Sequence, residues 1–235
     1  MTIEPQRPGS GFPANGDRRE RGYLPALRFR ALTPLFDLVV RGPMRERTVK
    51  EGLIEQAGLR DGQRLLDLGA GTGTLAIMAR RREACEVIGI VADPEILEIA
   101  RRKSGGAGTK VRFDEGTATE LPYEDASFDR VLSTLFFHHL TSADKRKTLG
   151  EVVRVLRPGG ELHLADFSVP ADPVQAILSW QVRLFDGVER TRENFAGELP
   201  DLIAEAGLTD VRERRRLRTF FGTVGLLAGS RLPPS

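Results

Sequence analysis

From residue 43 onward, short apolar runs alternate with segments whose apolar residues recur every three or four positions. A short apolar run bounded by turn residues is typical of a buried strand, and the longer period is typical of a helix with one buried face. The predicted strands span residues 64–68, 86–91, 110–114, 130–135 and 161–167. The predicted helices span about 43–57, 72–82, 94–103 and 145–156. Repeated strand–helix units predict a parallel sheet with helices on both faces, joined by right-handed crossovers.

The pattern changes after residue 167. Helices are predicted over residues 173–188 and 195–206, followed by a closing pair of strands over 211–220 and 223–229 that are joined at Gly222. The tripeptide Pro158-Gly159-Gly160 predicts a tight turn in front of the fifth strand.

The first 22 residues are polar and rich in Pro, Gly and Arg, so they are expected to form a disordered N-terminal tail. Residues 23–42 mix apolar and basic side chains and are interrupted by two prolines, which favours one or two short helices lying over the domain. One domain is therefore expected over residues 23–231, with 23–42 and 168–200 as a cap over the acceptor site. The tail lacks the apolar core of a signal peptide.

Composition narrows the function classes. Lysine and arginine (35) nearly balance aspartate and glutamate (33), and the basic residues are spread along the chain, so no nucleic-acid partner is expected. No run of about 18 apolar residues occurs, so stable membrane insertion is not expected and a cytoplasmic location follows. Cys85 is the only cysteine, and its spacing from the three histidines is not that of a metal site. A homodimer stays open.

The sharpest motif is Leu-Leu-Asp-Leu-Gly-Ala-Gly-Thr-Gly over residues 65–73, a strand that runs into a glycine loop and opens a helix. Such a loop lets a ligand approach the backbone, and the helix start offers unpaired N–H groups. In an open α/β sheet this point lies at the carboxyl ends of the strands, where ligands bind. The dinucleotide fingerprint requires glycine where Thr74 stands, so a nicotinamide-dependent oxidoreductase is disfavoured.

The glycine segment resembles the first motif of class I S-adenosylmethionine-dependent methyltransferases. Four more segments match that family in order and spacing, and the whole resemblance covers about residues 43–168. They are residues 89–97, 116–122, 127–140 and 156–160. The group of small-molecule enzymes that includes the ubiquinone and menaquinone C-methyltransferases is the most similar.

The resemblance implies a Rossmann-like, doubly wound, mostly parallel seven-stranded sheet with an antiparallel closing hairpin. It also implies S-adenosyl-L-methionine as cofactor and transfer of its methyl group to a small-molecule acceptor by in-line nucleophilic attack. The cofactor-binding residues that it implies are Asp67, Gly69, Ala70, Gly71, Thr72, Gly73, Val91, Ala92, Asp93, Thr117, Ala118, Ser133 and Thr134.

Two of these positions depart from the family pattern. Val91 stands where an acidic residue usually holds both ribose hydroxyls, and Thr117 stands where aspartate is frequent near the adenine. A hydrogen bond to a charged group contributes on the order of 1.5–3 kcal/mol, so losing the acid predicts weaker cofactor binding. Asp93 either replaces the missing acid or only caps the next helix. The alternatives are a modified cofactor, an altered binding pose of the cofactor, or a cofactor-binding protein that is not an active methyltransferase.

His138 and His139 follow the fourth strand and are the candidate catalytic bases, because a histidine accepts a proton near neutral pH. The other interpretation is that they cap or pack under a helix. His163 lies inside the fifth strand and is expected to be structural. The aromatic residues expected either in the core or around an acceptor pocket are Tyr23, Phe29, Phe36, Trp180 and Phe185.

Overall fold

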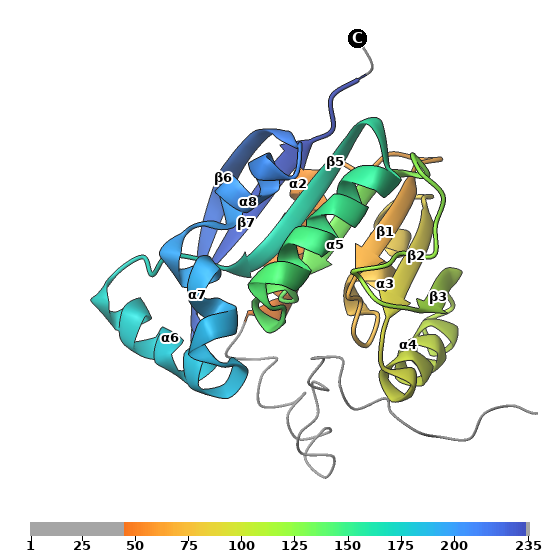
Figure 1. Ribbon diagram of the computed structural model, residues 1–235. Coiled ribbons are helices and arrows are strands. Elements are labelled where there is room, and N and C mark those ends of the chain that lie inside the picture. Colours follow the sequence, from red (N-terminus) through yellow and green to blue (C-terminus); the bar gives the residue numbers. More distant parts are fainter. Residues whose placement is uncertain (1–44, 234–235) are drawn as a thin grey trace, which may run out of the picture.

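A computed structural model describes residues 45–233 (Figure 1). Seven strands form one sheet in the order β3-β2-β1-β4-β5-β7-β6. Strands β1 to β5 run parallel, and β7 lies antiparallel between β5 and β6. The expected fold class, including the closing hairpin, is confirmed. The strands are β1 (Arg64–Leu68), β2 (Glu86–Val91), β3 (Val111–Glu115), β4 (Phe128–Thr134), β5 (Leu156–Phe167), β6 (Thr209–Thr219) and β7 (Gly222–Ser230).

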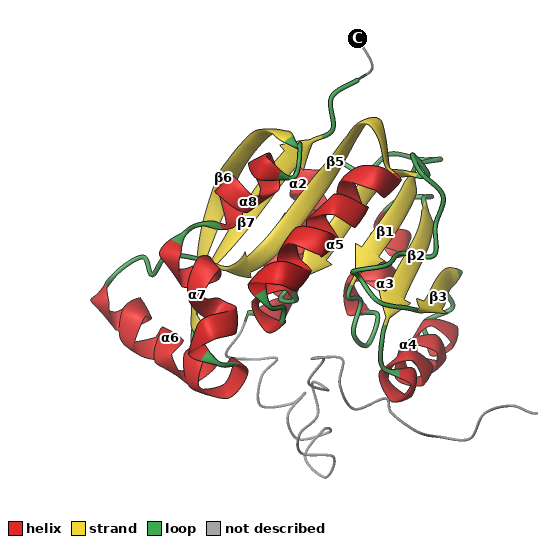
Figure 2. Ribbon diagram, viewed as in Figure 1, coloured by secondary structure: helices red, strands yellow, loops and turns green. Residues whose placement is uncertain are grey.

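Helices cover both faces of the sheet (Figure 2). Because side chains of a strand alternate between faces, Leu65 packs with α2, α3 and α4, whereas Leu66 packs with α5 and α8. These two sets of buried apolar side chains form the core on either side of the sheet. The helices are α2 (Glu46–Ala57), α3 (Thr74–Arg82), α4 (Pro94–Gly106), the 3-10 turn η1 (Phe137–His139), α5 (Ser142–Val155), α6 (Pro173–Asp186), α7 (Val188–Ala196) and α8 (Leu199–Glu205).

The strand order reverses direction at β1. Asp67 pairs with Gly89 of β2 on one side and with Leu132 of β4 on the other, so the chain crosses over in opposite directions from β1. In doubly wound sheets a crevice forms at this switch point, outside the carboxyl ends of the strands. The loop after β1, residues 69–73, lies at that point.

Two predictions from the sequence are wrong. Residues 158–160 do not form a separate tight turn, because they continue β5, with Gly159 N–H donating to the Arg231 carbonyl and Arg231 N–H donating to that of Gly160. The helix expected over residues 195–206 is two helices. Gly197, in a left-handed conformation (φ 81°), ends α7, and α8 begins two residues later.

Some expectations fall outside the described residues. They are the disordered tail over residues 1–22, the segment 23–42, and the aromatic residues Tyr23, Phe29 and Phe36. The domain boundaries therefore stay predictions. Between residues 45 and 233, no helix has the length and apolar character needed to cross a bilayer.

Candidate active site

The glycine loop after β1 contains three glycines with positive φ, at residues 69, 71 and 73. Gly69 and Gly73 are needed for packing, because a Cβ at either position would lie 2.5 Å from an aromatic ring, that of Phe136 or of Phe113. Gly71 differs, since a Cβ there would meet no atom of residues 45–233 within 4 Å. Within this part of the chain its backbone is therefore open to a ligand, in front of the first N–H groups of α3.

Asp67 of β1 fixes this loop by bonding to the helix that follows it. Its side chain is buried, and its Oδ2 accepts a hydrogen bond of 3.0 Å from the Ala76 N–H in the first turn of α3. Gly73, at the N-cap, has no side chain to satisfy that N–H, so Asp67 does so from β1. Burial raises the pKa of Asp67 to about 7, although Lys50 and the Ala76 N–H oppose the shift.

The end of β2 carries an apolar side chain, at the position that the sequence analysis expected to face a ribose. Val91 is buried and pairs with Glu115 of β3. Asp93 caps α4, as one of the two interpretations predicted, because its Oδ1 accepts the N–H groups of Glu95 (2.8 Å) and Ile96 (3.3 Å). Ala92 lies between these two positions. Thr117 and Ala118 follow β3, with Thr117 exposed and Ala118 buried.

The end of β4 completes this side of the site. Ser133 is buried, and its Oγ donates to the Leu68 carbonyl (2.9 Å), which ties β4 to the start of the glycine loop. Thr134 Oγ1 is buried and has no hydrogen-bond partner among the described residues. Buried hydroxyls are nearly always paired in folded proteins, so an unpaired one needs an explanation. A hydrogen bond to a polar group of a bound ligand would supply the missing partner. An open glycine backbone and an unpaired hydroxyl at one sheet edge fit the polar methionine and ribose parts of S-adenosylmethionine.

The two expected catalytic histidines differ in their surroundings. His138 is buried, and its Nδ1 lies 2.8 Å from Oδ1 of Asp166 at the end of β5. The side chain of His139 is 42% exposed, and its Nδ1 lies 3.0 Å from Oδ1 of Asp186, the last residue of α6. Asp186 Oδ2 also lies 3.9 Å from His138 Nε2. One carboxylate thus faces both rings.

The pKa values of the two imidazoles shift in opposite directions. Burial and the neighbouring His138 lower the pKa of His139, outweighing Asp186. Burial also lowers the pKa of His138, but the carboxylates of Asp166 and Asp186 outweigh it, and the net shift is upward. His139, whose side chain solvent reaches, therefore loses its proton at a lower pH than His138 does.

Comparisons with known proteins identify the family of this chain. A family model described as a methyltransferase domain matches residues 65–160. An O-methyltransferase of Penicillium expansum, cnsE, is 32% identical over 198 residues, which cover 78% of this chain and 69% of that protein. The chain belongs to the class I S-adenosylmethionine-dependent methyltransferases.

Further relatives of this methyltransferase carry different names. A demethylmenaquinone methyltransferase of Deinococcus radiodurans is 36% identical over 68% of the chain, and the match spans 66% of that protein's length. A second, from Thermus thermophilus, is 46% identical, and the match spans only 49% of its length. Among solved structures, the YcgJ protein of Bacillus subtilis superposes with a TM-score of 0.68 at 23% identity, covering 80% of this chain and all of that one.

The methyltransferase site contains acids that the sequence interpretation missed. Asp166 accepts hydrogen bonds from the N–H groups of three residues besides its bond to His138, and Asn194 donates a further bond. Burial alone would raise its pKa, but His138 and the Phe167 N–H hold that pKa below its ordinary value. An acid between the apolar residues Ala165 and Phe167 was a signal that could have found Asp166. The sequence holds no such signal for Asp186, which α6 brings back from a distant segment.

The region expected to cap the acceptor site contributes to these contacts. Arg190 of α7 donates to the His139 carbonyl (2.7 Å). Lys145 of α5 is fully buried, and its Nζ bonds Glu193 Oε2 (2.7 Å) and Asn194 Oδ1 (2.9 Å). These bonds attach α7 to α5 and to the turn that holds the histidines. Trp180 (51% exposed) and Phe185 (85% exposed) of α6 are not core residues, so that interpretation is wrong for both.

The expectation that no metal site exists rested on histidine and cysteine spacing alone. The structure brings the ligand atoms of His138, His139 and Asp186 within 4.8 Å of one another. His163, by contrast, is buried between Gln56 and Glu161, as expected of a structural residue.

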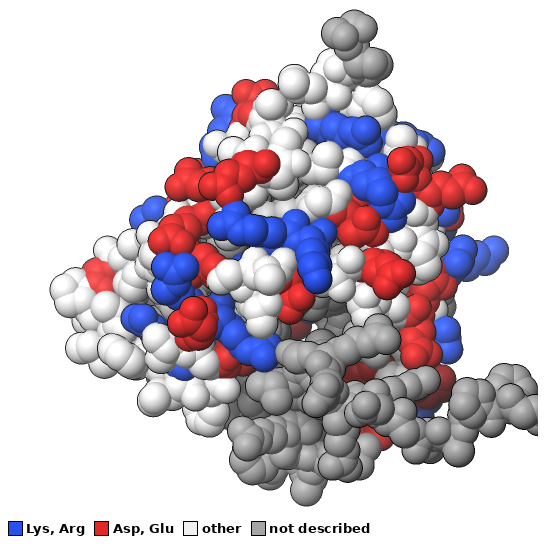
Figure 3. All heavy atoms as spheres, viewed as in Figure 1, with Lys and Arg blue, Asp and Glu red and all other residues white. Residues whose placement is uncertain are grey.

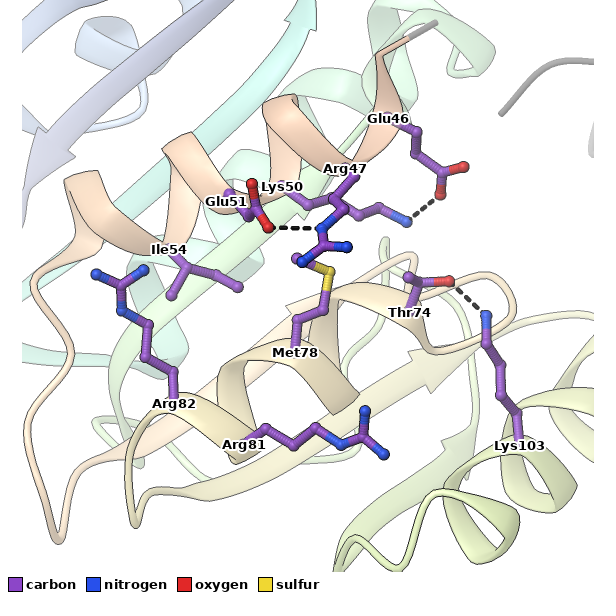
Figure 4. Close-up of a pocket in the computed structure, with 10 residues that line it drawn as sticks. All are labelled: Glu46, Arg47, Lys50, Glu51, Ile54, Thr74, Met78, Arg81, Arg82 and Lys103. Atoms are coloured by element: carbon purple, nitrogen blue, oxygen red, sulfur yellow. Dashed lines mark hydrogen bonds and ion pairs between the residues drawn. The ribbon is translucent and has the colours of Figure 1, made fainter. Parts of the chain in front are cut away.

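Two features of the molecular surface lie outside this site, namely the distribution of charge and a hollow between three helices. Positive and negative side chains are interspersed over the face shown in Figure 3. A hollow between α2, α3 and α4 contains none of the expected site residues, and both of its acids are paired, Glu51 with Arg47 and Glu46 with Lys50 (Figure 4). Its lining residues are Glu46, Arg47, Lys50, Glu51, Ile54, Thr74, Met78, Arg81, Arg82 and Lys103.

Proposed function

We propose that this chain transfers the methyl group of S-adenosylmethionine to a small-molecule acceptor. Two observations at the switch point of the sheet carry the proposal. The Gly71 backbone, in the loop after β1, and the Thr134 hydroxyl, at the end of β4, both lack partners among residues 45–233. Family membership supports the same cofactor. A nicotinamide cofactor lacks this support, because Thr74 replaces the third glycine of its fingerprint.

The cofactor supplies an activated methyl group on sulfur, and the protein supplies orientation. Loop residues 69–73 and Thr134 hold the methionine part, with Asp67 fixing the loop from below. Val91, Ala92 and Asp93 lie along the ribose, Thr117 and Ala118 along the adenine, and Ser133 keeps β4 against β1. The acceptor binds opposite, over the turn that carries the histidines.

His139 is the group that accepts a proton from the acceptor. Its side chain is partly exposed, its lowered pKa keeps it uncharged at neutral pH, and Asp186 orients its ring. His138 acts as a positioning residue, since it is buried and held by Asp166. A proton acceptor is useful where the acceptor atom carries a proton that methyl transfer must remove.

Val91 favours a second candidate, a protein that binds the cofactor without transferring its methyl group. Calorimetric titration of S-adenosylmethionine and S-adenosylhomocysteine distinguishes the two candidate functions. It is carried out on the full chain, on Val91→Asp and on the uncharged control Val91→Asn. We expect micromolar binding by the parent and about ten- to hundredfold tighter binding by Val91→Asp alone. Absence of binding by all three proteins would overturn the cofactor assignment, and binding without turnover of any acceptor would favour the second candidate.

The proposal also covers the cellular location, the partners and the oligomeric state of the protein. A free small-molecule acceptor in the cytoplasm, with no nucleic-acid partner, fits the near-neutral, dispersed charge. A homodimer is supported by α6, whose apolar side chains Ile177, Leu184 and Phe185 face solvent while Gln175 and Ser179 face the sheet. Light scattering on the parent and on Ile177→Glu tests this contact. A dimer that dissociates in the variant supports it, and a monomeric parent overturns it.

A further inference from the structure

Three side chains from two distant segments place metal-ligating atoms together. His138 and His139 come from η1 and Asp186 from the end of α6, and their ligand atoms all lie within 4.8 Å of one another. Asp186 Oδ1 is 3.0 Å from His139 Nδ1, and Oδ2 is 3.9 Å from His138 Nε2. A divalent ion binds nitrogen and carboxylate oxygen at about 2.0–2.2 Å, so its ligand atoms are separated by roughly 3–3.5 Å. Small side-chain adjustments bring the three groups to that spacing.

His138 is already oriented as a metal ligand. Its Nδ1 lies 2.8 Å from Asp166, whose position is fixed by three backbone N–H groups and by Asn194. In the neutral imidazole, which is the form that binds a metal, a proton held on Nδ1 by Asp166 leaves the lone pair at Nε2, which faces Asp186. Histidines that bind metal commonly donate their other N–H to a carboxylate in this way, which fixes the tautomer and the ring orientation.

We propose that His138 Nε2, His139 Nδ1 and Asp186 together bind one divalent transition-metal ion. Two imidazoles and one carboxylate suit ions such as Zn²⁺, Fe²⁺ or Co²⁺ better than Mg²⁺, which prefers oxygen ligands. Three protein ligands leave coordination positions open for water or substrate. The partly exposed side of His139 is where those positions face solvent.

The ion also defines an acceptor class, a step that rests on the proposed methyl transfer. An acceptor with a hydroxyl or enol oxygen would coordinate the ion, which lowers the pKa of that oxygen. Its proton would pass to water, and the resulting oxyanion, or the carbon conjugated to it, would attack the cofactor methyl as the carbon–sulfur bond breaks and S-adenosylhomocysteine leaves. With the ion bound, His139 would be a ligand, and water would accept the proton of the oxygen that the ion acidifies.

The test is Co²⁺ binding to the full, tag-free chain after removal of metals with a chelator and dialysis. Visible absorption of protein-bound Co²⁺ reports nitrogen and oxygen coordination, and calorimetry with Zn²⁺ gives the stoichiometry. We expect one ion per chain, and at least tenfold weaker binding by Asp186→Asn and by His139→Gln. Asp201→Asn, which removes an exposed acid from α8, is the charge-matched control and leaves binding unchanged. Circular dichroism establishes that each variant is folded.

No Co²⁺ absorption by the parent, or binding that Asp186→Asn and His139→Gln leave unchanged, would overturn the metal site. Separate measurements test the proposed function, namely cofactor titration and a methyl-transfer assay on the metal-depleted protein. If that protein binds S-adenosylmethionine and retains full activity but takes up no Co²⁺, His139 acts as the base and only the metal site fails. If Co²⁺ binds at the three residues and the cofactor does not, the metal site stands and the proposed function fails.

Discussion

His138 Nδ1 lies 2.8 Å from Asp166 Oδ1, and both side chains are buried. This bond joins the turn after β4 to the end of β5, two neighbouring parallel strands. The same carboxylate accepts the N–H groups of Phe136 and Phe137, so Asp166 shapes the turn and also fixes the ring of one of its histidines. The conformation of the acceptor side therefore depends on one charged group.

Replacing that group tests this dependence. Asp166→Asn keeps the side-chain volume but has one acceptor oxygen, whereas both carboxylate oxygens of Asp166 accept hydrogen bonds. At least one buried N–H therefore loses its partner. We expect the free energy of unfolding to fall by roughly 2–4 kcal/mol, measured by urea denaturation. NMR titration should show that the pKa of His138 falls, because the Asp166 carboxylate that raises it has been removed. Unchanged stability together with an unchanged His138 titration would contradict this role.

The glycines of the loop predict different outcomes for the same substitution. Gly71→Ala places a methyl group in open space at φ 52°, so we expect a loss of about 1–2 kcal/mol in stability and at least tenfold weaker cofactor binding. Gly69→Ala also collides with Phe136, so its loss of stability is larger. Gly62→Ala has a positive φ and open space but lies before β1, away from the site.

Thermal denaturation and calorimetric titration of the three variants separate packing from ligand access. Gly62→Ala is the matched control, with a similar backbone penalty and unchanged cofactor affinity. If Gly71→Ala binds S-adenosylmethionine as tightly as Gly62→Ala does, the backbone at Gly71 does not contact the cofactor.

The parallel half of the fold was predictable because its signals are local. Strand, glycine loop and helix follow one another within residues 64–82, and Asp93 before Pro94 marks the start of α4. The break between α7 and α8 also had a local signal, in Gly197 followed by Pro200. The extension of β5 over residues 156–160 had none, since it depends on pairing with Arg231 about 70 residues away.

The sequence motifs indicated which strand ends form the candidate site, but they contained only part of its acceptor side. The sequence motif identifies the histidines, but their partners Asp166 and Asp186 lie 28 and about 47 residues further along. Which carboxylate meets which ring depends on how β5 and α6 pack, and no spacing rule contains that information. The expectation of no metal site was open to error for the same reason.

The buried pair Lys145–Glu193 holds the acceptor-side helix α7 to α5. Lys145→Met leaves Glu193 as a buried charge without its partner, so we expect a loss of about 3–5 kcal/mol in the free energy of unfolding. The double variant Lys145→Met/Glu193→Leu removes both charges and should recover most of that loss. Urea denaturation of the two variants measures the difference.

Arg146 provides a neighbouring control. Its ion pair with Glu205 has both side chains more than half exposed, so Arg146→Met should cost less than about 1 kcal/mol. Equal losses for Lys145→Met and Arg146→Met would show that the buried pair contributes no more than the exposed one.

Asp67 predicts a pH dependence of stability. Burial raises its pKa in the folded protein from 3.8 to about 7, so between these values the folded state binds a proton that the unfolded state has released. The free energy of unfolding therefore falls as pH rises through this window, by up to about 4 kcal/mol, and is insensitive to this group outside it. Asp67→Asn cannot ionise but still accepts the Ala76 N–H. Urea denaturation between pH 4 and 8 should show the parent losing stability relative to Asp67→Asn across the window, and a constant difference would refute the raised pKa.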